Sequence, residues 1–381
     1  MDFNLTDTYL QDLEHYQRFA REEIAPRFRQ MEQEGATPQA LLDKMAQAQL
    51  LGIPMPKEYG GLGKDFISAT LCMETLAKAS PATAGIINVS TELVADNILR
   101  HGTEEQKAKY LPDLCTGKVI GAFALTEPGA GSDASGVRTV AEDKGDHWLL
   151  NGTKCFITNA EIAGTFLIAA MTDIGEGKKK ISMFIVEKGF SGFRIGKHEN
   201  KMGIRSSSTC ELILEDCVVP KENLLGQKGK GLGIALGCLD SGRVMIAAQA
   251  LGIAQACWDD TVAYLKEHAQ ETGFAVNTQR TQFRLAELQT KIDAARLLIY
   301  RAAAAWSEGK KYGKEAAMAK YYASDVANEA TRLCLELTGL DGCTCGTRLE
   351  EYFRDAKITE IYEGTNEIQL MVIAGQLDIK V

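Results

Sequence analysis

The stretch HWLLNGTKCFI, residues 147–157, places an Asn-Gly pair between two runs of strand-favouring residues. Asn-Gly readily adopts the left-handed backbone of a two-residue turn, so this pattern predicts a β-hairpin. Three more short runs rich in branched or aromatic residues follow it: TFLIAAMTD (165–173), ISMFIVEKG (181–189) and CELILEDCVVP (210–220). Together these runs predict an antiparallel β domain over residues 119–226.

Helical periodicity dominates both flanks of this β domain. Apolar residues spaced three to five apart predict helices on the N-terminal side, over 6–32, 38–50, 66–78, 83–100 and 104–112. The same period predicts helices on the C-terminal side, over 230–267, 276–309, 314–338 and 367–377. A strand block between helical blocks favours an α+β protein of three packed domains over an alternating βαβ fold. We therefore expect helical domains at 1–118 and 227–381.

Composition excludes several classes of protein. The chain has 381 residues, 45% hydrophobic and 24% charged, and a net charge of −9. That charge argues against a general nucleic-acid or anionic-membrane surface. The N-terminus, MDFNLTDTYLQDLEHY, lacks the basic-then-apolar layout of a secretion signal, and no apolar run approaches the roughly 20 residues of a membrane span. These features predict a cytoplasmic protein.

The sequence predicts no metal site and no disulfide framework. Ten cysteines and five histidines are scattered along the chain. The closest cysteines, Cys343 and Cys345, are separated by one residue, which is neither a redox nor a zinc spacing. We expect free, mostly buried thiols. No GxGxxG follows a predicted strand at a helix start, which argues against a nicotinamide-binding Rossmann domain.

Two motifs in the β domain are candidates for cofactor binding. In FALTEPGAGSD (123–133), Pro128 and two glycines shape a loop that offers the hydroxyls of Thr126 and Ser132. Such a loop surrounds a heteroaromatic ring or a pyrophosphate, although it equally suits a hairpin connection. In KCFITNA (154–160), Phe156 and Thr158 share one strand face. They could flank a planar ring or form half-buried sheet.

A third motif, IYEGTNEIQ (361–369), sets Glu363 directly before Gly364. A helix boundary explains the glycine but not the glutamate. With five other motifs this stretch resembles the acyl-CoA dehydrogenase family, most closely its bacterial short-chain members of the butyryl-CoA type. The six, in family order, are PKEYGGLG (56–63), GAFALTEPGAGSDASG (121–136), LNGTKCFITNA (150–160), KMGIRSSSTCELILEDCVVP (201–220), LDSGR (239–243) and RDAKITEIYEGTNEIQ (354–369).

The resemblance implies a fold, a cofactor and partners. The expected fold is an N-terminal helical domain, a middle antiparallel β-barrel domain and a C-terminal four-helix bundle. The expected cofactor is FAD, in a homotetramer that passes electrons to electron-transferring flavoprotein. The expected reaction converts a short or compact acyl-CoA to its trans-2-enoyl-CoA. Two alternatives remain: an enoyl-CoA reductase running the same chemistry backward, and a flavin-poor CoA-binding or assembly protein.

The resemblance also assigns roles to residues. Glu363 would remove the α-proton of the thioester, and its backbone N–H and the flavin ribityl chain would bind the developing enolate oxygen. Some family members carry the base at the position of Gly242, which cannot serve here. Flavin contacts are implied for Leu125, Thr126, Ser132, Phe156, Thr158, Thr365 and Glu367. Substrate contacts are implied for Ser132, Asp240, Arg243 and Gly364, although an exposed structural ion pair is a rival role for Arg243.

The chain departs from the family pattern at two predicted inter-subunit flavin contacts. An Arg-x-Gln-Phe-Gly stretch that grips the FAD diphosphate of a neighbouring subunit reads HAQET here, residues 268–272, so His268 replaces arginine. A Gln-x-x-Gly-Gly stretch reads ELTGL, residues 336–340, so Glu336 replaces glutamine while Gly339 remains. We expect weakened flavin contacts at both. Arg354 is expected to be a structural ion-pair partner.

Overall fold

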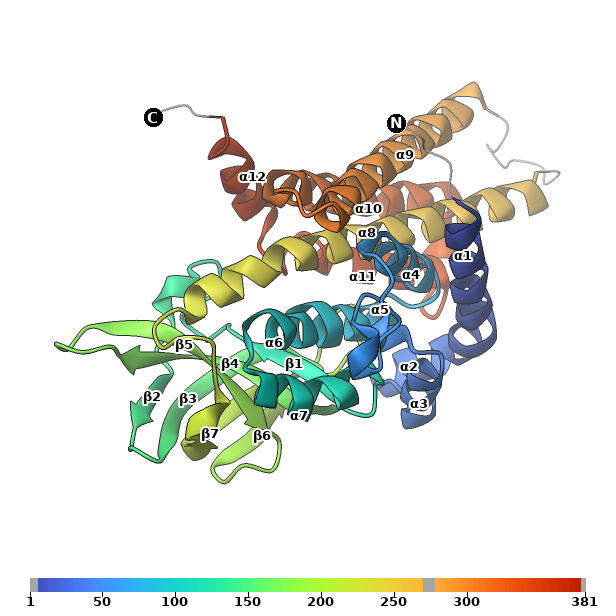
Figure 1. Ribbon diagram of the computed structural model, residues 1–381. Coiled ribbons are helices and arrows are strands. Elements are labelled where there is room, and N and C mark those ends of the chain that lie inside the picture. Colours follow the sequence, from blue (N-terminus) through green and yellow to red (C-terminus); the bar gives the residue numbers. More distant parts are fainter. Residues whose placement is uncertain (1–5, 270–277, 378–381) are drawn as a thin grey trace.

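The computed structural model describes residues 6–269 and 278–377. Helices form both flanks of the chain and strands form the middle, as the sequence predicts. Figure 1 shows the long helix α8 (Gly231–Glu267) crossing the molecule, with the sheet near its start and the other C-terminal helices beside it.

The N-terminal part is a packed group of helices. Their bounds are α1 Asp7–Phe19, α2 Phe28–Glu34, α3 Gln39–Gln47, α4 Phe66–Ala79, α5 Pro81–Ile87, α6 Asp96–His101 and α7 Glu104–Cys115. A capping box begins α7, in which the Thr103 side chain accepts from the Gln106 backbone and Gln106 accepts from Thr103. Between α5 and α6 the chain forms a π-helix, η5 (Asn88–Ala95). The predicted helix 83–100 is therefore present but widened at its centre.

The middle part is one sheet of eight strands. They are β1 Ile120–Ala124, β2 Val140–Asp143, β3 His147–Thr158, β4 Ala163–Asp173, β5 Lys179–Glu187, β6 Phe193–His198, β7 Thr209–Pro220 and β8 Leu224–Leu225. The order β6-β7-β3-β2-β4-β5-β8 is mostly antiparallel, with β1 and β2 both parallel to β4. Within 6–269 and 278–377 no pairing joins β6 to β8, so the sheet curves without closing by strand pairing.

The predicted hairpin at Asn151-Gly152 is wrong. These residues lie inside β3, where the register against β7 shifts between Leu150 and Gly152. The Asn151 amide donates to Asp216 Oδ1 (3.0 Å) and accepts from the Asp216 backbone N–H (2.8 Å). The pair therefore forms a bulge anchored to the neighbouring strand, and β3 continues through it.

The C-terminal part has three long and two short helices among the described residues. They are α8, α9 Gln279–Ser307, α10 Gly313–Cys343, α11 Arg348–Ile358 and α12 Asn366–Ala374. Helix α10 continues past the predicted end at 338, with a kink at Gly339. By length and composition α8 could cross a membrane, contrary to our reading of the sequence, but 67% of its most apolar window is buried inside the protein. We read α8 as the central core helix.

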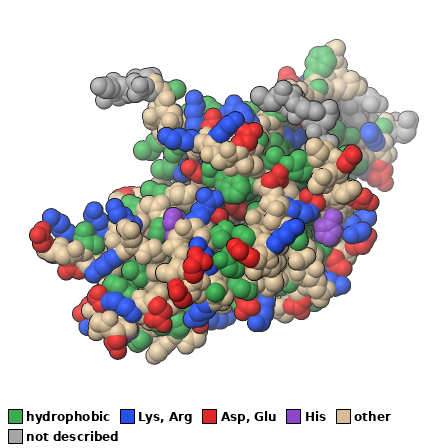
Figure 2. Space-filling view, viewed as in Figure 1, with side chains coloured by type: hydrophobic (Ala, Val, Ile, Leu, Met, Phe, Trp, Pro, Cys, Tyr) green, Lys and Arg blue, Asp and Glu red, His purple; other side chains and the backbone are tan. Residues whose placement is uncertain are grey.

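One hydrophobic core joins the two helical parts. It includes residues from α4, such as Phe66 and Leu76, and residues from α8 to α11, such as Leu251, Ile292 and Tyr352. A second core lies within the sheet part, around Trp148 and Phe166. Acidic and basic side chains are intermixed over the face in Figure 2. The two helical parts therefore pack as one unit, which would support any site that lies between them and the sheet.

Candidate active site

Glu363 lies in a tight turn between α11 and α12. Its backbone is left-handed (φ 54°), and so is that of Gly364 (φ 87°). A non-glycine residue adopts this conformation at a cost, so other contacts must hold it. The Gln369 side-chain amide donates to both carbonyls, at 3.2 Å from Glu363 and 2.8 Å from Gly364. Gly364 is favoured there because side chains rarely adopt its φ of 87°, and a Cβ would also lie 2.8 Å from that same amide nitrogen.

Two further contacts tie this turn to the helical core. The Lys320 ammonium (3.0 Å) and the Ser324 hydroxyl (3.0 Å), both on α10, donate to Asn366 Oδ1. The Tyr362 hydroxyl donates to the Gln249 side chain on α8, whose amide donates to the Pro81 carbonyl (2.6 Å). The Glu363 backbone is thereby fixed from α8 and α10 at once.

The Glu363 carboxyl is set up as a base. Its Oε2 atom is enclosed and has no hydrogen-bond partner among the described residues. Burial raises the pKa of Glu363 to about 7, while Arg243, Lys320 and a hydrogen bond from Asn88 favour the ionised form. A carboxyl with a pKa near neutrality and a free oxygen can accept a proton from a substrate at physiological pH.

Gly242 makes room for this carboxyl. A Cβ at Gly242 would lie 2.9 Å from Glu363 Oε2 and 3.2 Å from Leu93 Cδ2. Helix α8 therefore passes close to the carboxyl at the position where the alternative base was considered.

Asp240 and Arg243 form an ion pair on the same stretch of α8. Arg243 Nη1 lies 2.6 Å from Asp240 Oδ1, and only 9% of the arginine side chain is exposed. The exposed structural pair considered from the sequence is therefore wrong. Burial raises the pKa of Asp240, although Arg243 opposes the shift. Arg243 Nε has no partner among the described residues, so the guanidinium retains a donor beside Glu363.

The loop containing Leu125, Thr126 and Ser132 is held by a buried ion pair. Lys154 on β3 donates to Glu127 Oε1 (2.7 Å) and to the Leu125 carbonyl (3.1 Å). Glu127 also accepts from the backbone N–H groups of Arg138 (2.7 Å) and Thr139 (3.0 Å). Burial lowers the pKa of Lys154 to about 8, with Glu127 opposing the shift. The loop is thus a shaped structure and not a simple hairpin connection.

Phe156 is presented outward from β3 next to this loop. Its backbone is left-handed (φ 57°) and its side chain is 63% exposed. The backbone N–H of its neighbour Cys155 donates to the Thr126 carbonyl (3.0 Å), which joins the strand to the loop. Thr158 is partly exposed at the end of the same strand. A strained, exposed aromatic residue beside hydroxyl groups suits a planar ligand.

The remaining predicted flavin contacts lie elsewhere. His268, the C-cap of α8, is 25 residues beyond Arg243, about 38 Å along an α-helix. It stacks on Tyr264, whose hydroxyl donates to Asp341 just past Gly339. Glu336 is paired with Arg284, and residues 270–272 of HAQET lie outside the described residues. Thr365 caps α12 next to Glu363, whereas Glu367 is exposed on that helix.

The structure therefore divides most of the predicted residues into three groups, apart from Ser132 on its exposed loop and Thr365 and Glu367 at the start of α12. Glu363, Gly364, Asp240 and Arg243 gather around one turn of α8. Leu125, Thr126, Phe156 and Thr158 cluster on the loop and on β3. His268, Glu336 and Gly339 lie at the far end of the helical bundle. Arg354 pairs with Glu32 (2.7 Å) and Glu350 (2.8 Å), which confirms its structural role.

Two polar residues of the first group were missed from the sequence. Asn88 and Glu92, on η5, are buried, and each has one oxygen without a hydrogen-bond partner among the described residues. The stretch GIINVSTELVADNIL (85–99) places two acids, Glu92 and Asp96, in a helical run, but the helical period alone does not separate buried acids from exposed ones.

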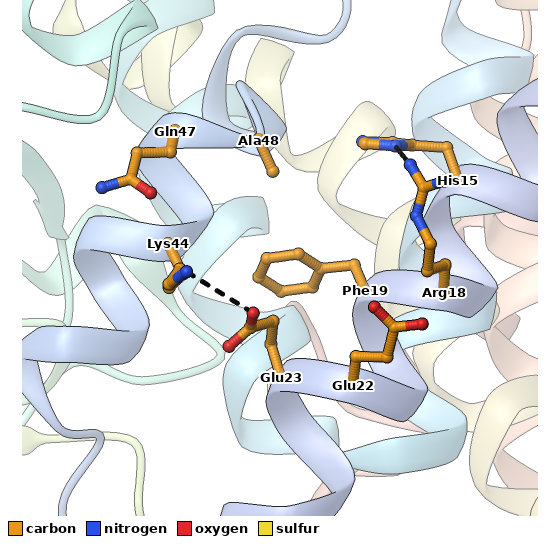
Figure 3. A pocket seen from close by; sticks show the side chains of 8 residues that line it. All are labelled: His15, Arg18, Phe19, Glu22, Glu23, Lys44, Gln47 and Ala48. Carbon is orange, nitrogen blue, oxygen red and sulfur yellow. Dashed lines mark hydrogen bonds and ion pairs between the residues drawn. The ribbon is translucent and has the colours of Figure 1, made fainter.

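Two other features lie outside this site. Figure 3 shows a cavity of about 260 Å³ between α1 and α3, over Phe19, with an ion pair between Lys44 and Glu23 (3.6 Å). On the sheet, Glu161, His198 and Cys210 place ligand atoms within 4.8 Å of one another, the single such cluster in the described residues. These three residues are distant in sequence, so spacing alone could not reveal them. The absence of a metal site, expected from the sequence, stays a prediction.

Comparisons with known proteins give the family. Three family models match the chain in order: the acyl-CoA dehydrogenase N-terminal domain over 6–118, the middle domain over 122–217 and the C-terminal domain over 229–377. The chain belongs to the acyl-CoA dehydrogenase family. Its members are FAD-dependent oxidoreductases, and so is this enzyme. The matched ranges follow the helical, strand and helical parts.

Relatives cover the whole chain. The short-chain specific acyl-CoA dehydrogenase of Clostridium acetobutylicum is 46% identical over 99% of this chain and 100% of its own. The solved structure of butyryl-CoA dehydrogenase from Megasphaera elsdenii is 43% identical, with a TM-score of 0.95 over 99% of this chain and 100% of that one. A chain from the structural work on electron transferring flavoprotein of Acidaminococcus fermentans is 46% identical, with a TM-score of 0.96 over 100% of both.

The residues of this acyl-CoA dehydrogenase fit FAD on one side. The shaped loop of Leu125 and Thr126, together with exposed Phe156, offers a surface for the flavin ring. Ser132 is exposed near the end of that loop, where a diphosphate could be bound. The fit is poorer at the far end of the bundle, since Glu336 brings a carboxylate, partly neutralised by Arg284.

Proposed function

We propose that this enzyme oxidises a short or compact acyl-CoA to its trans-2-enoyl-CoA and passes the electrons to electron-transferring flavoprotein. The observation that carries the proposal is the Glu363 carboxyl, with its enclosed, unpaired oxygen and a pKa of about 7. The full-length similarity to short-chain enzymes supports the acyl class. The similarity to the chain studied with electron transferring flavoprotein supports the acceptor.

The chain's own residues account for the proton-transfer half of this reaction. Glu363, held by Gln369 and Lys320, would accept the proton from the α-carbon of the thioester. Arg243 lies beside the carboxyl and favours its ionised form before the proton arrives. The backbone N–H of Glu363 would bind the thioester oxygen as negative charge develops there. When bound, FAD supplies the acceptor for the β-hydrogen and its electron pair.

The same residues would serve the reverse reaction. A relative from Acetobacterium woodii, the caffeyl-CoA reductase-Etf complex subunit CarC, is 43% identical over 91% of this chain and 92% of its own. Glu363 would then donate its proton to the α-carbon of an enoyl-CoA. The direction of the reaction depends on the reduction potentials of the substrate and of the electron acceptor. Enoyl-CoA reduction is therefore the second candidate function.

We further infer a cytoplasmic homotetramer. Apolar side chains are exposed on the C-terminal helices, among them Phe283 (60%), Leu340 (87%) and Met371 (68%). Exposed apolar residues on neighbouring helices are typical of a subunit interface. Burying them between copies would also bring the far end of one bundle toward another subunit.

The test is anaerobic reduction of the purified enzyme. The visible spectrum shows whether flavin is present, and butyryl-CoA should bleach it. Crotonyl-CoA with reduced electron-transferring flavoprotein examines the reverse direction. A protein that purifies without flavin and takes none up from added FAD would instead be the CoA-binding or assembly protein.

A further inference from the structure

Glu92 is a buried acid that the proton transfer does not use. It lies in the middle of η5, is 1% exposed, and is the one acid in the stretch Asn88–Ala95. The hydroxyl of Ser241 on α8 lies near its carboxyl but donates to the Cys238 carbonyl (3.0 Å), and the Oε1 atom of Glu92 is enclosed without a hydrogen-bond partner among the described residues. A buried carboxyl oxygen left unpaired is costly, so a native structure keeps one where a ligand group can supply the missing bond.

The surroundings of Glu92 are rich in carboxyl groups. Asp96 follows on the same helical run and is paired with Arg100 (2.6 Å), whose guanidinium lies 5.5 Å from the Trp306 ring centre. Burial and then Asp96 raise the pKa of Glu92 to about 8, while Arg100 opposes the shift. Arg100, the cation nearest Glu92, is already paired with Asp96, so no free cation is offered to an added anion, whereas the unpaired oxygen of Glu92 can accept from a hydrogen-bond donor.

Glu92 belongs to the same region as the proton-accepting Glu363. Asn88, four residues earlier on η5, donates a hydrogen bond to the Glu363 carboxyl. Ser241, which lies near Glu92, immediately precedes Gly242, and a Cβ at Gly242 would lie 2.9 Å from Glu363 Oε2 and 3.2 Å from Leu93, the neighbour of Glu92. Both acids therefore lie near the same turn of α8. An acyl chain whose α-carbon lay at Glu363 would have its far end on the side of Glu92 if it ran past Leu93.

We propose that Glu92 determines specificity and that the preferred acyl group carries a hydrogen-bond donor, such as a hydroxyl, at its distal end. The inference rests on the proposed acyl-CoA oxidation and names its substrate class. Glu92 accepts the hydrogen bond from that group, while apolar Val89 and Leu93, also on η5, are buried beside it. Acyl groups that end in a carboxylate are disfavoured, because Arg100 is already paired with Asp96 and does not balance a further negative charge at this end of the site.

The test compares two acyl-CoAs that match in size and differ at the last atom with a third, larger one that ends in a carboxylate. Valeryl-CoA ends in a methyl group, 4-hydroxybutyryl-CoA ends in a hydroxyl, and glutaryl-CoA ends in a carboxylate. We expect wild-type kcat/KM to be at least about tenfold higher for 4-hydroxybutyryl-CoA than for valeryl-CoA, since a site built for a donor rejects the analogue that lacks it. Glutaryl-CoA should be the poorest of the three.

Variants separate recognition from structure. Glu92→Leu should reverse the preference in favour of valeryl-CoA, whereas Glu92→Gln, which keeps an acceptor oxygen, should retain part of it. Glu105→Gln, at an exposed acid on α7, is the matched control and should leave the ratio unchanged. Thermal unfolding of each variant checks the fold, and the isosteric glutamine keeps the test open if the leucine variant fails to fold.

The outcomes are distinguishable. Oxidation of valeryl-CoA as well as or better than 4-hydroxybutyryl-CoA, or a ratio that Glu92→Leu leaves unchanged, would overturn the inference and leave the proposed function intact. Failure of all three compounds and of butyryl-CoA to bleach the flavin would remove the proposed function, and the inference with it.

Discussion

At the scale of single residues, this site depends on the environment given to one carboxyl. A glutamate in water has a pKa near 4.3 and is a weak base toward a carbon acid. Enclosure raises the pKa of Glu363 to about 7, while Arg243 and Lys320 prevent a larger shift. The left-handed backbone at Glu363 places the carboxyl there, and Gln369 holds that backbone. The identity of the residue, the strain of its backbone and the burial of its carboxyl act together at this position.

The first prediction concerns Glu363 itself. Because the ionised carboxyl is the base and its pKa is about 7, the rate of flavin reduction should rise with pH, reach about half its maximum near pH 7 and level off toward pH 8. Glu363→Gln should bind acyl-CoA and flavin but lose about 100-fold or more in reduction rate, and this rise with pH should disappear. Stopped-flow bleaching from pH 6 to 8 measures both. A glutamine variant that bleaches at nearly the wild-type rate would show that another group takes the proton.

The second prediction concerns Gly242. Adding a methyl group in Gly242→Ala places Cβ 2.9 Å from Glu363 Oε2, so the carboxyl must move. A displacement of this kind should lower the reduction rate about tenfold, since misplacement by 1 Å costs up to about 100-fold. Gly237→Ala, on the same helix with nothing within 4 Å of its Cβ, is the matched control. Equal rates for the two variants would mean that the carboxyl adapts freely.

At the scale of elements, the sequence predicted whether a segment is helix or strand better than it predicted where a helix or strand is interrupted by a bulge or a π-helical turn. The strand block and long helices follow from periodicity, and β4 and β5 lie where branched and aromatic runs indicate. Asn151-Gly152 misled because a bulge uses the same backbone freedom as a turn, and the anchoring Asp216 is on another strand. The π-helix η5 has no local signature that periodicity detects, so Asn88 and Glu92 were missed. Motifs located Glu363, but its burial depends on packing between distant helices.

The third prediction concerns the ion pair that shapes the loop before β2. Lys154 is fully buried and Glu127 is 7% exposed, so removing one partner leaves an uncompensated buried charge. Lys154→Met should lower the free energy of unfolding by about 3–5 kcal/mol and weaken flavin retention. The double variant Lys154→Met/Glu127→Gln should recover part of that loss. Urea denaturation measures the free energy of unfolding of each variant.

A surface pair provides the comparison for that experiment. Lys118 and Asp113 lie 3.1 Å apart, and 73% of the lysine side chain is exposed. Lys118→Met should change the free energy of unfolding by about 1 kcal/mol or less. Similar losses from Lys118→Met and Lys154→Met would show that burial of the Glu127 pair adds nothing to its contribution.

At the scale of the whole molecule, the distance along α8 matters most. Arg243 lies beside Glu363 and His268 ends the helix, about 38 Å away. A single FAD close to Glu363 therefore reaches His268 of the same chain poorly, whereas a neighbouring subunit can bring its own His268 there. This geometry agrees with the inter-subunit role implied by the family motif, and it links flavin retention to assembly.

The last prediction follows from that link. An arginine at position 268 would be permanently charged and could hold a diphosphate with two parallel hydrogen bonds. The Nδ1 atom of His268 faces the Tyr264 carbonyl (2.8 Å), so the imidazole offers a diphosphate at most its other nitrogen. His268→Arg should therefore tighten FAD binding by roughly tenfold or more, because a charge-assisted bond contributes about 1.5–3 kcal/mol. Titration of the apoprotein with FAD measures this effect.

His147→Arg on β3 is the control, because it adds the same charge far from the bundle and should change nothing. If His268→Arg matches that control, then the end of α8 does not face the diphosphate in the assembled enzyme.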